Sequence, residues 1–436
     1  MNSLQKALLQ TTSPGGAALT PQDLNPVLME YLGRLSPLYR LVAKKQAQGR
    51  VHEFVVRTSV PPAWFEGEVT TPSPTASGYE RRAVQLKILR NSGGVSGFQQ
   101  ATSQRFVDAL QTEIVGSLEG IADTLEWATI YGDSVDAYQF DGLEAFLRKN
   151  GVTAQPVANG GNILDVNAVV SLSDLDAMVD VAHATRAADR DAKVFIMSQQ
   201  MISKISGLQT RINRTVETVE TEGGFRFVTY RDIPILPSSI VRPTAVTSSP
   251  AVSVTATAGG TLANGTYHYR VASVTDAGEQ VAGTSGSVTI SAPNSTATLT
   301  WTADPDARLY KIFRGATSAH DNMALVDVIP ARTYNAEGAV TGNVTTYADN
   351  GSKTPLVAFR PYAANDETIA LVNISETRGL YYIGMVSPLG EPTDTFLTYI
   401  PLATRKSAFE YMIEAFTAVV VPYPQLHVIA RRARVA

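Results

Sequence analysis

The chain has 436 residues, enough for roughly two or three domains, and its 44% hydrophobic content is ordinary for a globular protein. Its formal net charge of −4 supplies no overall field that would draw it onto nucleic acid, so any DNA contact must be local. The absence of cysteine excludes disulfides, thiolate zinc sites and cysteine nucleophiles. No signal-peptide core opens the chain and no run of about eighteen apolar residues occurs, so we expect a soluble protein, made inside a cell, without a membrane span.

The first 98 residues predict an arm followed by a hairpin. Leu28 and Leu32 belong to a helical pattern in the arm, which we expect to pack on another surface. Residues 51–59 and 79–90 alternate apolar and polar side chains and predict two strands. The Pro-, Thr- and Ser-rich residues 60–78 form a longer tip than compact domains usually contain, so we expect this tip to meet another chain.

The strongest helix pattern spans residues 103–131. Its apolar side chains recur at steps of three and four and form one stripe, while acidic and amide side chains lie mostly away from it. At about 1.5 Å per residue the helix would be roughly 43 Å long, more than a compact domain of this size needs. The stripe consists of Phe106, Leu110, Ile114, Leu118, Ile121 and Leu125.

Residues 140–240 alternate helix and strand patterns. Ser173 is a predicted N-cap for the helix that starts in "SLSDLDAMVDVAHATRA". The stretch "AKVFIMS" predicts a short buried strand, and "GGFRFVTYRDIPILPSSIV" predicts two more. Together these patterns predict an α+β unit.

The character of the chain changes near residue 243, where Thr, Ser, Ala, Val and Gly begin to dominate. Short predicted strands then follow one another with turn residues between them, a pattern typical of an all-β sandwich. Tyr267, Tyr269 and Trp301 are its predicted core aromatics, because each buried ring removes about 150 to 250 Å² of surface from water. Patterns typical of a mixed helix and strand protein return after residue 355, so we expect an independent domain inserted at 245–355.

The remaining parts resemble, in their order, the major capsid proteins of tailed double-stranded DNA bacteriophages, which have the Hong Kong 97-type fold. The likeness is strengthened by "FDGLEAFLRKNG", "AKVFIMSQQMISKISGL" and "GGFRFVTYRDIPILPSS". It implies an α+β fold with an inserted immunoglobulin-like sandwich. The implied parts are an N-terminal arm (1–50), an extended hairpin loop (51–98), a peripheral domain with a spine helix (99–136), an axial domain in two pieces (137–244 and 356–400), and a return to the peripheral domain (401–436).

The resemblance implies that function lies in subunit contacts. Subunits of this family form hexamers and pentamers of an icosahedral head, so we expect identical subunits as partners, a virion location and assembly in the host cytoplasm. The resemblance also implies a portal. A separate scaffolding protein is expected because residues 1–50 are too short for a scaffolding segment and show no sustained heptads. The predicted contact residues are Leu28, Leu32, Val84, Leu86, Lys87, Ile88, Phe140 and Leu143.

Packaged double-stranded DNA is a further expected partner, recognised without sequence specificity. Two basic clusters, in the arm and at the chain end, could neutralise phosphates, although solvated ends or intersubunit ion pairs are the commoner explanation of such clusters. The candidates are Lys44, Lys45, Arg431, Arg432 and Arg434.

The insert resembles a fibronectin type III or bacterial immunoglobulin-like module. We expect it to be displayed outside the shell, because folded insertions survive best at exposed loops. Two roles remain open: adhesion to host-surface glycans, and clasping of a neighbouring subunit or decoration protein.

No constellation in the sequence predicts catalysis. The chain lacks an H-E-x-x-H zinc helix, its five histidines are scattered, and "GSKT" at 351–354 lacks the glycine spacing of a phosphate loop. We therefore expect no enzyme activity, no cofactor and no metal. Some members of the capsid family crosslink a loop lysine to an asparagine; Lys87 lies on the hairpin, but residues 401–436 contain no asparagine, so we expect no such crosslink.

Two other classes stay open. Encapsulin compartments share the implied fold and enclose cargo enzymes instead of a genome. A secreted adhesin would suit only the insert, and the chain shows no export signal.

Overall fold

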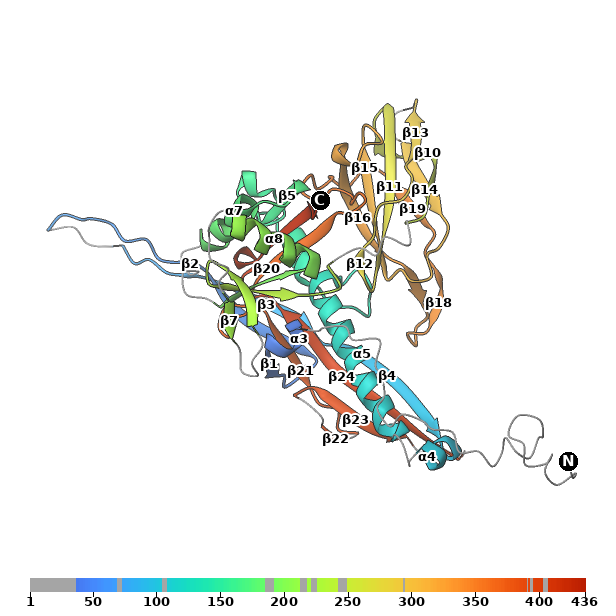
Figure 1. Ribbon diagram of the computed structural model, residues 1–436. Coiled ribbons are helices and arrows are strands. Elements are labelled where there is room, and N and C mark those ends of the chain that lie inside the picture. The colour runs from blue at the N-terminus through green and yellow to red at the C-terminus, as the bar shows by residue number, and fades with distance from the viewer. Residues whose placement is uncertain are drawn as a thin grey trace, which may run out of the picture.

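The structure is a computed structural model that describes residues 37–68, 73–103, 108–184, 192–211, 218–220, 226–241, 249–292, 295–389, 391–392, 395–402 and 407–436. It is a mixed α/β protein in which an elongated body, built on helix α5, leads up to a second sheet and to the insert (Figure 1). A thin hairpin projects from the junction of these parts. Helix α5 therefore connects regions that lie far apart in sequence.

Helix α5 (Ala109–Tyr131) is the predicted spine, but it begins later than the pattern suggested. Asp108 caps it by accepting a hydrogen bond from the backbone N–H of Gln111 at 3.1 Å. Of the predicted helix residues before this cap, Ser103 ends a separate short helix, α4 (Gly97–Ser103), and 104–107, with Phe106, lie outside the described residues. At about 1.5 Å per residue, α5 is roughly 35 Å long rather than the predicted 43 Å.

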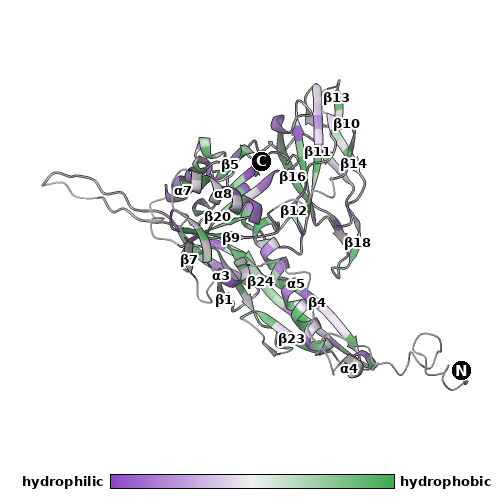
Figure 2. Ribbon diagram, in the orientation of Figure 1, coloured by the Kyte–Doolittle hydropathy of each residue, from purple (hydrophilic) through white to green (hydrophobic). Residues whose placement is uncertain are grey.

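A six-stranded sheet packs along α5. Its path runs β1-β21-β24-β23-β22, and β4 pairs with the free side of β24. Strand β24, which contacts α5, is rich in apolar residues (Figure 2). Tyr411 of β24 joins the layers, because its hydroxyl lies 2.8 Å from that of Ser117 on α5. The strands are β1 (Ala43–Gln46), β4 (Lys87–Ser96), β21 (Tyr381–Met385), β22 (Glu391–Pro392), β23 (Leu397–Leu402) and β24 (Ala408–Val420); α3 (Pro37–Leu41) packs beside α5.

A seven-stranded sheet forms the second layer, in the order β5-β25-β20-β6-β9-β8-β7. Ser171, not the predicted Ser173, caps its helix α7, and Asp174 completes a capping box with it. The strands are β5 (Ile163–Val169), β6 (Lys193–Met197), β7 (Thr218–Glu220), β8 (Arg226–Tyr230), β9 (Ile233–Pro237), β20 (Glu367–Asn373) and β25 (Val428–Arg434). The helices are α6 (Leu143–Lys149), α7 (Leu172–His183) and α8 (Gln199–Arg211), and 3₁₀ turns cover Val157–Asn159 and Pro424–Leu426.

Two segments join other sheets than the sequence analysis predicted. The last strand, β25, lies inside the seven-stranded sheet between β5 and β20, whereas a return of the whole chain end to the α5 body was expected. Conversely, β21 to β23 belong to the sheet beside α5, although residues 356–400 were expected to complete the other layer. Neighbouring buried apolar runs do not reveal which of two sheets each will join.

The hairpin consists of β2 (Val51–Ser59) and β3 (Gly78–Gln85), paired antiparallel from Val51↔Gln85 to Ser59↔Gly78. The predicted second strand, 79–90, is two strands: the chain turns at Leu86, whose N–H donates to Arg50 O at 2.9 Å, and continues as β4. The alternation of side chains continues through this break, so the pattern alone could not reveal it.

The insert contains two antiparallel sheets around a core of its own. One sheet is β10-β14-β19, and the other runs β12-β11-β15-β16 with β13 on β11. A β17–β18 ribbon extends from them. The strands are β10 (Val252–Leu262), β11 (Gly265–Thr275), β12 (Gly278–Glu279), β13 (Gly286–Ile290), β14 (Ser295–Trp301), β15 (Leu309–Gly315), β16 (Met323–Pro330), β17 (Arg332–Tyr334), β18 (Val340–Asn343) and β19 (Thr346–Asp349), with a 3₁₀ turn at His320–Asn322.

The second sheet of the insert is buried on both faces. In β15, Tyr310 and Ile312 face the core between the insert's sheets, whereas Leu309 and Phe313 join the main core of the chain. The side chains of β11 alternate in the same way: Val271 faces the core between the insert's sheets, and Val274 joins the main core. The expectation of an independently packed domain is therefore wrong: the insert has a core between its two sheets, but the other face of its second sheet belongs to the core of the rest of the chain.

Candidate assembly surfaces

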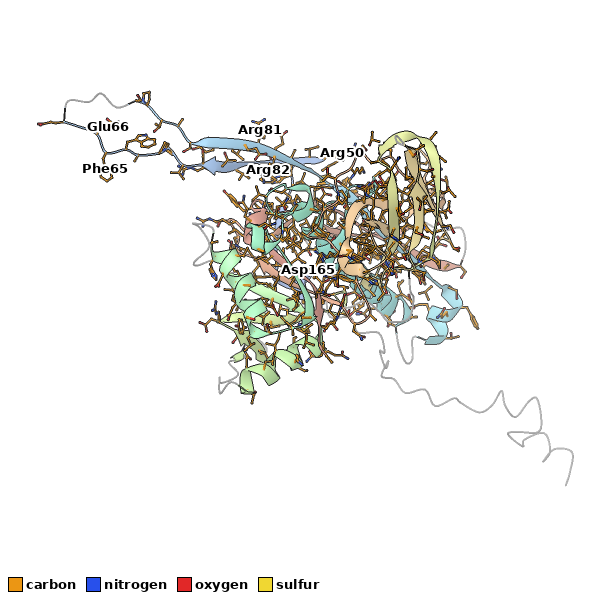
Figure 3. All side chains as sticks on the ribbon, turned by 90° about the horizontal axis from the view of Figure 1, so that it is seen from above. Arg50, Phe65, Glu66, Arg81, Arg82 and Asp165 are labelled. Carbon is orange, nitrogen blue, oxygen red and sulfur yellow. The ribbon has the colours of Figure 1, made fainter. Side chains whose placement is uncertain are left out.

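The hairpin carries large apolar side chains that its own chain leaves exposed. Trp64 is 73% exposed and Phe65 is fully exposed at the tip, while Val55 and Tyr79 are more than 60% exposed on the strands. Figure 3 shows Phe65 far from the body of the protein, at the end of the extension. Isolated two-stranded ribbons are at best marginally stable in water, so this hairpin gains by packing against another surface.

The root of the hairpin is held to the body by polar and aromatic contacts. The His52 ring stacks on Phe54 at 5.9 Å, and its Nε2 lies 3.3 Å from the hydroxyl of Tyr381 on β21. Burial and the nearby Lys45 ammonium lower the pKa of His52, which favours the neutral ring. Arg82 adds a hydrogen bond to Pro422 O at 3.3 Å. The hairpin is thus anchored at one end only.

The four predicted contact residues near the hairpin have different environments. Val84 packs partly against the main core, and Leu86 is buried in it at 7% exposure, so Leu86 is not available to a neighbour. Lys87 donates a hydrogen bond to Ala137 O at 2.6 Å. Ile88 is 54% exposed and remains a candidate contact residue.

Phe140 and Leu143 were predicted to face other subunits, and the structure contradicts this. Both lie in the main core, with 7% and 0% exposure. The chain folds back tightly after α5, and the N–H of Gly142 donates to Gly132 O at 2.8 Å. A Cβ at Gly142 would approach Ala128 O to 2.3 Å, so a side chain at this position would prevent the turn that buries Leu143.

The basic cluster at the chain end is also mostly inside the protein. Arg431 and Arg432 are each 1% exposed, so they cannot face packaged DNA in this conformation. Arg432 pairs with Asp165 at 2.6 Å and with Asp321, and Arg434 pairs with Asp366 at 2.6 Å. Three arginines within the four residues 431–434 gave no sign that the strand would be buried.

Arg431 belongs to a buried quartet of charges that joins the insert to the rest of the chain. Its Nη2 lies 2.7 Å from Glu279 Oε2, and Lys311 Nζ lies 2.6 Å from the same oxygen and contacts Glu144. Burial opposes ionisation of Glu144, but Lys311 and Arg431 outweigh it and lower its pKa. Burial likewise opposes the charge of Arg431, yet Glu279 and Glu144 raise its pKa. Two cations and two anions therefore neutralise one another where the insert contacts the rest of the chain, a contact called the seam below.

The sequence analysis missed this quartet, although one signal was present. Lys311 is the single polar residue in the middle of "LYKIF", a strand otherwise apolar on both faces. A lysine in such a strand requires a buried acidic partner. The second link across the seam, from Trp127 Nε1 on α5 to Thr275 O at 2.7 Å, gave no comparable signal.

The remaining predicted residues lie as follows. Lys44 and Lys45 lie at the surface on β1, with their ammonium groups 3.8 Å and 4.0 Å from the ring centroids of Tyr39 and Tyr381. Leu28 and Leu32 lie outside the described residues. In the core between the insert's two sheets are Tyr269, which is fully buried and donates to Asp349 Oδ2 at 2.9 Å, and Trp301, with Tyr267 at its margin.

Within the described ranges, no group of three or more metal-binding side chains comes together. None of the helices in those ranges is long and apolar enough to cross a membrane.

A groove lies beside the hairpin root, where β4 meets β21, β24 and the loop after α5. It encloses about 520 Å³. Its walls are mainly apolar, and its charged lining side chains are Arg50 and Lys87. A second, more polar cleft of about 730 Å³ lies between the insert and the loop after α5 and includes Asp136, Arg308 and Tyr334.

Comparison with solved structures reveals chains of similar architecture, among them the subunits of two shells. The holo-SrpI encapsulin complex of Synechococcus elongatus PCC 7942 aligns with a TM-score of 0.52 at 12% identity, covering 96% of this chain and 94% of that chain. The capsid of an empty GTA particle aligns with a TM-score of 0.50 at 12% identity, covering 97% and 98%. At this identity the likeness shows the fold alone, which is that of Hong Kong 97-like capsid proteins.

Comparison by sequence gives the family. A search of curated proteins found no match. The sequence model of the SU10 major capsid protein family matches residues 7–247, more than half of the chain. The protein therefore belongs to the SU10 major capsid protein family.

Proposed function

We propose that the chain self-assembles into the hexamers and pentamers of an icosahedral phage head that encloses double-stranded DNA. The observation that carries this proposal is the hairpin, which extends from the body with Trp64 and Phe65 exposed. A monomer gains nothing from such an extension, whereas a closed shell of identical copies supplies a surface for every tip. The role is structural rather than catalytic.

The other partners follow from this function. DNA would be held without sequence specificity, by phosphate neutralisation at the inner surface. With Arg431 and Arg432 buried, the predicted basic residues left to serve it are Lys44, Lys45 and the partly exposed Arg434. A scaffolding protein and a portal would be separate chains, and assembly would take place in the host cytoplasm.

For the insert we infer an immunoglobulin-like sandwich displayed on the outside. Strand order supports this: if β10, β11, β13, β14, β15 and β16 are strands B, C, C′, E, F and G, the pairs B–E and C′–C–F–G occur as in immunoglobulin domains. Strand β19 then takes the place of D beside E. The charged seam favours a reinforcing role, and binding of a decoration protein or a host glycan remains compatible with the exposed sheet.

The similarity to the Synechococcus encapsulin favours a second candidate, a protein compartment that encloses cargo enzymes. The two candidates differ in contents and not in subunit architecture. Nucleic acid inside purified particles would support the head, and a folded protein cargo would support the compartment.

The deciding experiment is electron microscopy of the purified chain, expressed with and without the other structural proteins of its virus. We expect closed icosahedral shells with hexameric and pentameric units, and nuclease-resistant DNA in shells from infected cells. A stable monomer under all assembly conditions contradicts the proposal.

A further inference from the structure

The groove beside the hairpin root has the character of a receiving site for an aromatic, acidic segment. Ile88, Met385 and Phe416 line it with apolar surface. Arg50 and Lys87 add positive charge, and among the described residues that line the groove none is acidic. Its volume of about 520 Å³ lies in the range of protein pockets that bury a ligand, roughly 300–1,000 Å³.

The hairpin tip has the complementary character. In "AWFEGE", two exposed aromatic residues, Trp64 and Phe65, are followed closely by Glu66 and Glu68, both exposed. Aromatic anchors at the centre with charges at the rim are the usual arrangement of a strong protein contact. The apolar walls of the groove suit the rings, and its cations suit the glutamates.

The tip of one chain cannot reach the groove of the same chain. Arg50, at the groove, and Phe65, at the tip, are separated by strand β2 and an extended segment, about 50 Å at 3.3 Å per residue. Figure 3 shows Arg50 at the root and Phe65 and Glu66 at the opposite end of the hairpin. The occupant of the groove must therefore come from a second copy.

The insert supports one wall of this groove. Tyr138 lines the groove and stacks edge-on against Tyr334 of the insert, with ring centroids 4.7 Å apart. The hydroxyl of Tyr334 donates to Asp136 Oδ2 at 3.0 Å. On the other side, Lys87 donates to Ala137 O. The loop that contributes Tyr138 is thus held between the insert and β4.

We propose that Trp64 and Phe65 of one subunit fill the groove of a second copy, with Glu66 near Lys87, and that Tyr334 holds the receiving wall in place. This inference rests on the proposed function, since it names where the hairpin binds during assembly. It gives the insert a task inside the shell: it is a positioning element for the contact between subunits.

Disulfide trapping tests the contact directly, because the chain has no cysteine of its own. Two single variants, Phe65→Cys and Ile88→Cys, are assembled together and oxidised. We expect a covalent dimer that contains one copy of each, identified by intact mass with one variant isotopically labelled. Phe65→Cys mixed with Val169→Cys is the control, since Val169 is 44% exposed on β5 and lies outside the groove. Shells that form without the mixed dimer, or with equal crosslinking in the control, overturn the inference.

Substitutions test the roles of the aromatic anchors and of the wall. Trp64→Ala with Phe65→Ala, and separately Tyr334→Ala, should lower shell yield at least tenfold while circular dichroism of the subunit is unchanged. Tyr79→Ala, on the same hairpin, should assemble normally. Lys87→Glu should also reduce yield, and Glu66→Lys should restore it when combined with Lys87→Glu. Equal loss with Tyr79→Ala, or no rescue, contradicts the inference. Failure of the wild-type chain to assemble would instead contradict the proposed function.

Discussion

Arg431, on the last strand of the chain, lies with its Nη2 2.7 Å from Glu279 Oε2 of the insert. Both side chains are at most 1% exposed, so water cannot solvate either charge if its partner is removed. Together with Lys311 and Glu144 it makes the insert a constitutive part of the subunit.

Lys311→Met should therefore destabilise the subunit strongly. The change leaves one anion of the quartet uncompensated, and breaking a buried pair by removal of one partner costs about 3–5 kcal/mol. Urea unfolding of the unassembled subunit measures the loss. Lys353→Met is the matched control: Lys353 is 52% exposed and pairs with Asp327, so its loss should cost under about 1 kcal/mol. Equal effects of the two changes would show that the seam is not closed to water.

Deletion of residues 245–355, with a short linker in their place, should give a poorly soluble subunit. The deletion removes Leu309, Phe313 and Leu325 from the main core and uncovers their apolar partners. We expect strong binding of a hydrophobic dye and loss of cooperative unfolding. A smaller deletion, of Glu337 and Gly338 in the β17–β18 turn, should leave the unfolding transition of the free subunit nearly unchanged. A soluble, cooperative subunit after the large deletion would mean that the insert is separable after all.

Glu126 on α5 predicts a dependence of stability on pH. Burial raises its pKa from 4.5 to about 8, although Ser238 donates a hydrogen bond to it at 2.7 Å. The folded pKa exceeds the unfolded one, so stability should fall as pH rises from about 5 to 8 and level off above that, by an amount on the order of a few kcal/mol. Glu126→Gln should flatten this part of the profile, as measured by unfolding free energy at successive pH values. An unchanged slope in the variant would assign the dependence to other groups.

Substitution of two glycines by alanine should change the stability of the subunit in opposite directions. A Cβ at Gly93 would approach the Tyr411 hydroxyl to 2.6 Å, so Gly93→Ala should disturb the contact with Ser117 and cost about 1–3 kcal/mol. At Gly116, on α5, a Cβ would meet no heavy atom within 4 Å outside its own helix backbone and its chain neighbours. Gly116→Ala should stabilise the helix by up to about 1 kcal/mol. Thermal unfolding compares both with the wild type, and a stabilising Gly93→Ala would contradict the described packing.

Much of the fold could be predicted from local pattern. The strand at 51–59 has the predicted bounds, because alternation and turn residues mark both ends. Where two patterns merge, prediction failed: alternation runs unbroken through Leu86, and the helical stripe runs on past the cap at Asp108. The buried quartet depends on four residues from four distant segments, and no local pattern encodes such a meeting. The same holds for the burial of Arg431 and Arg432.

The position of β25 has a consequence for folding. This strand lies between β5 and β20, so both neighbours have an unsatisfied edge until residues 428–434 are available. A chain that has not yet folded these residues can form the hairpin and much of α5 but cannot close this sheet or pair Arg431 with Glu279. Until β25 is in place, both edges are thus open to pairing with strands of other chains.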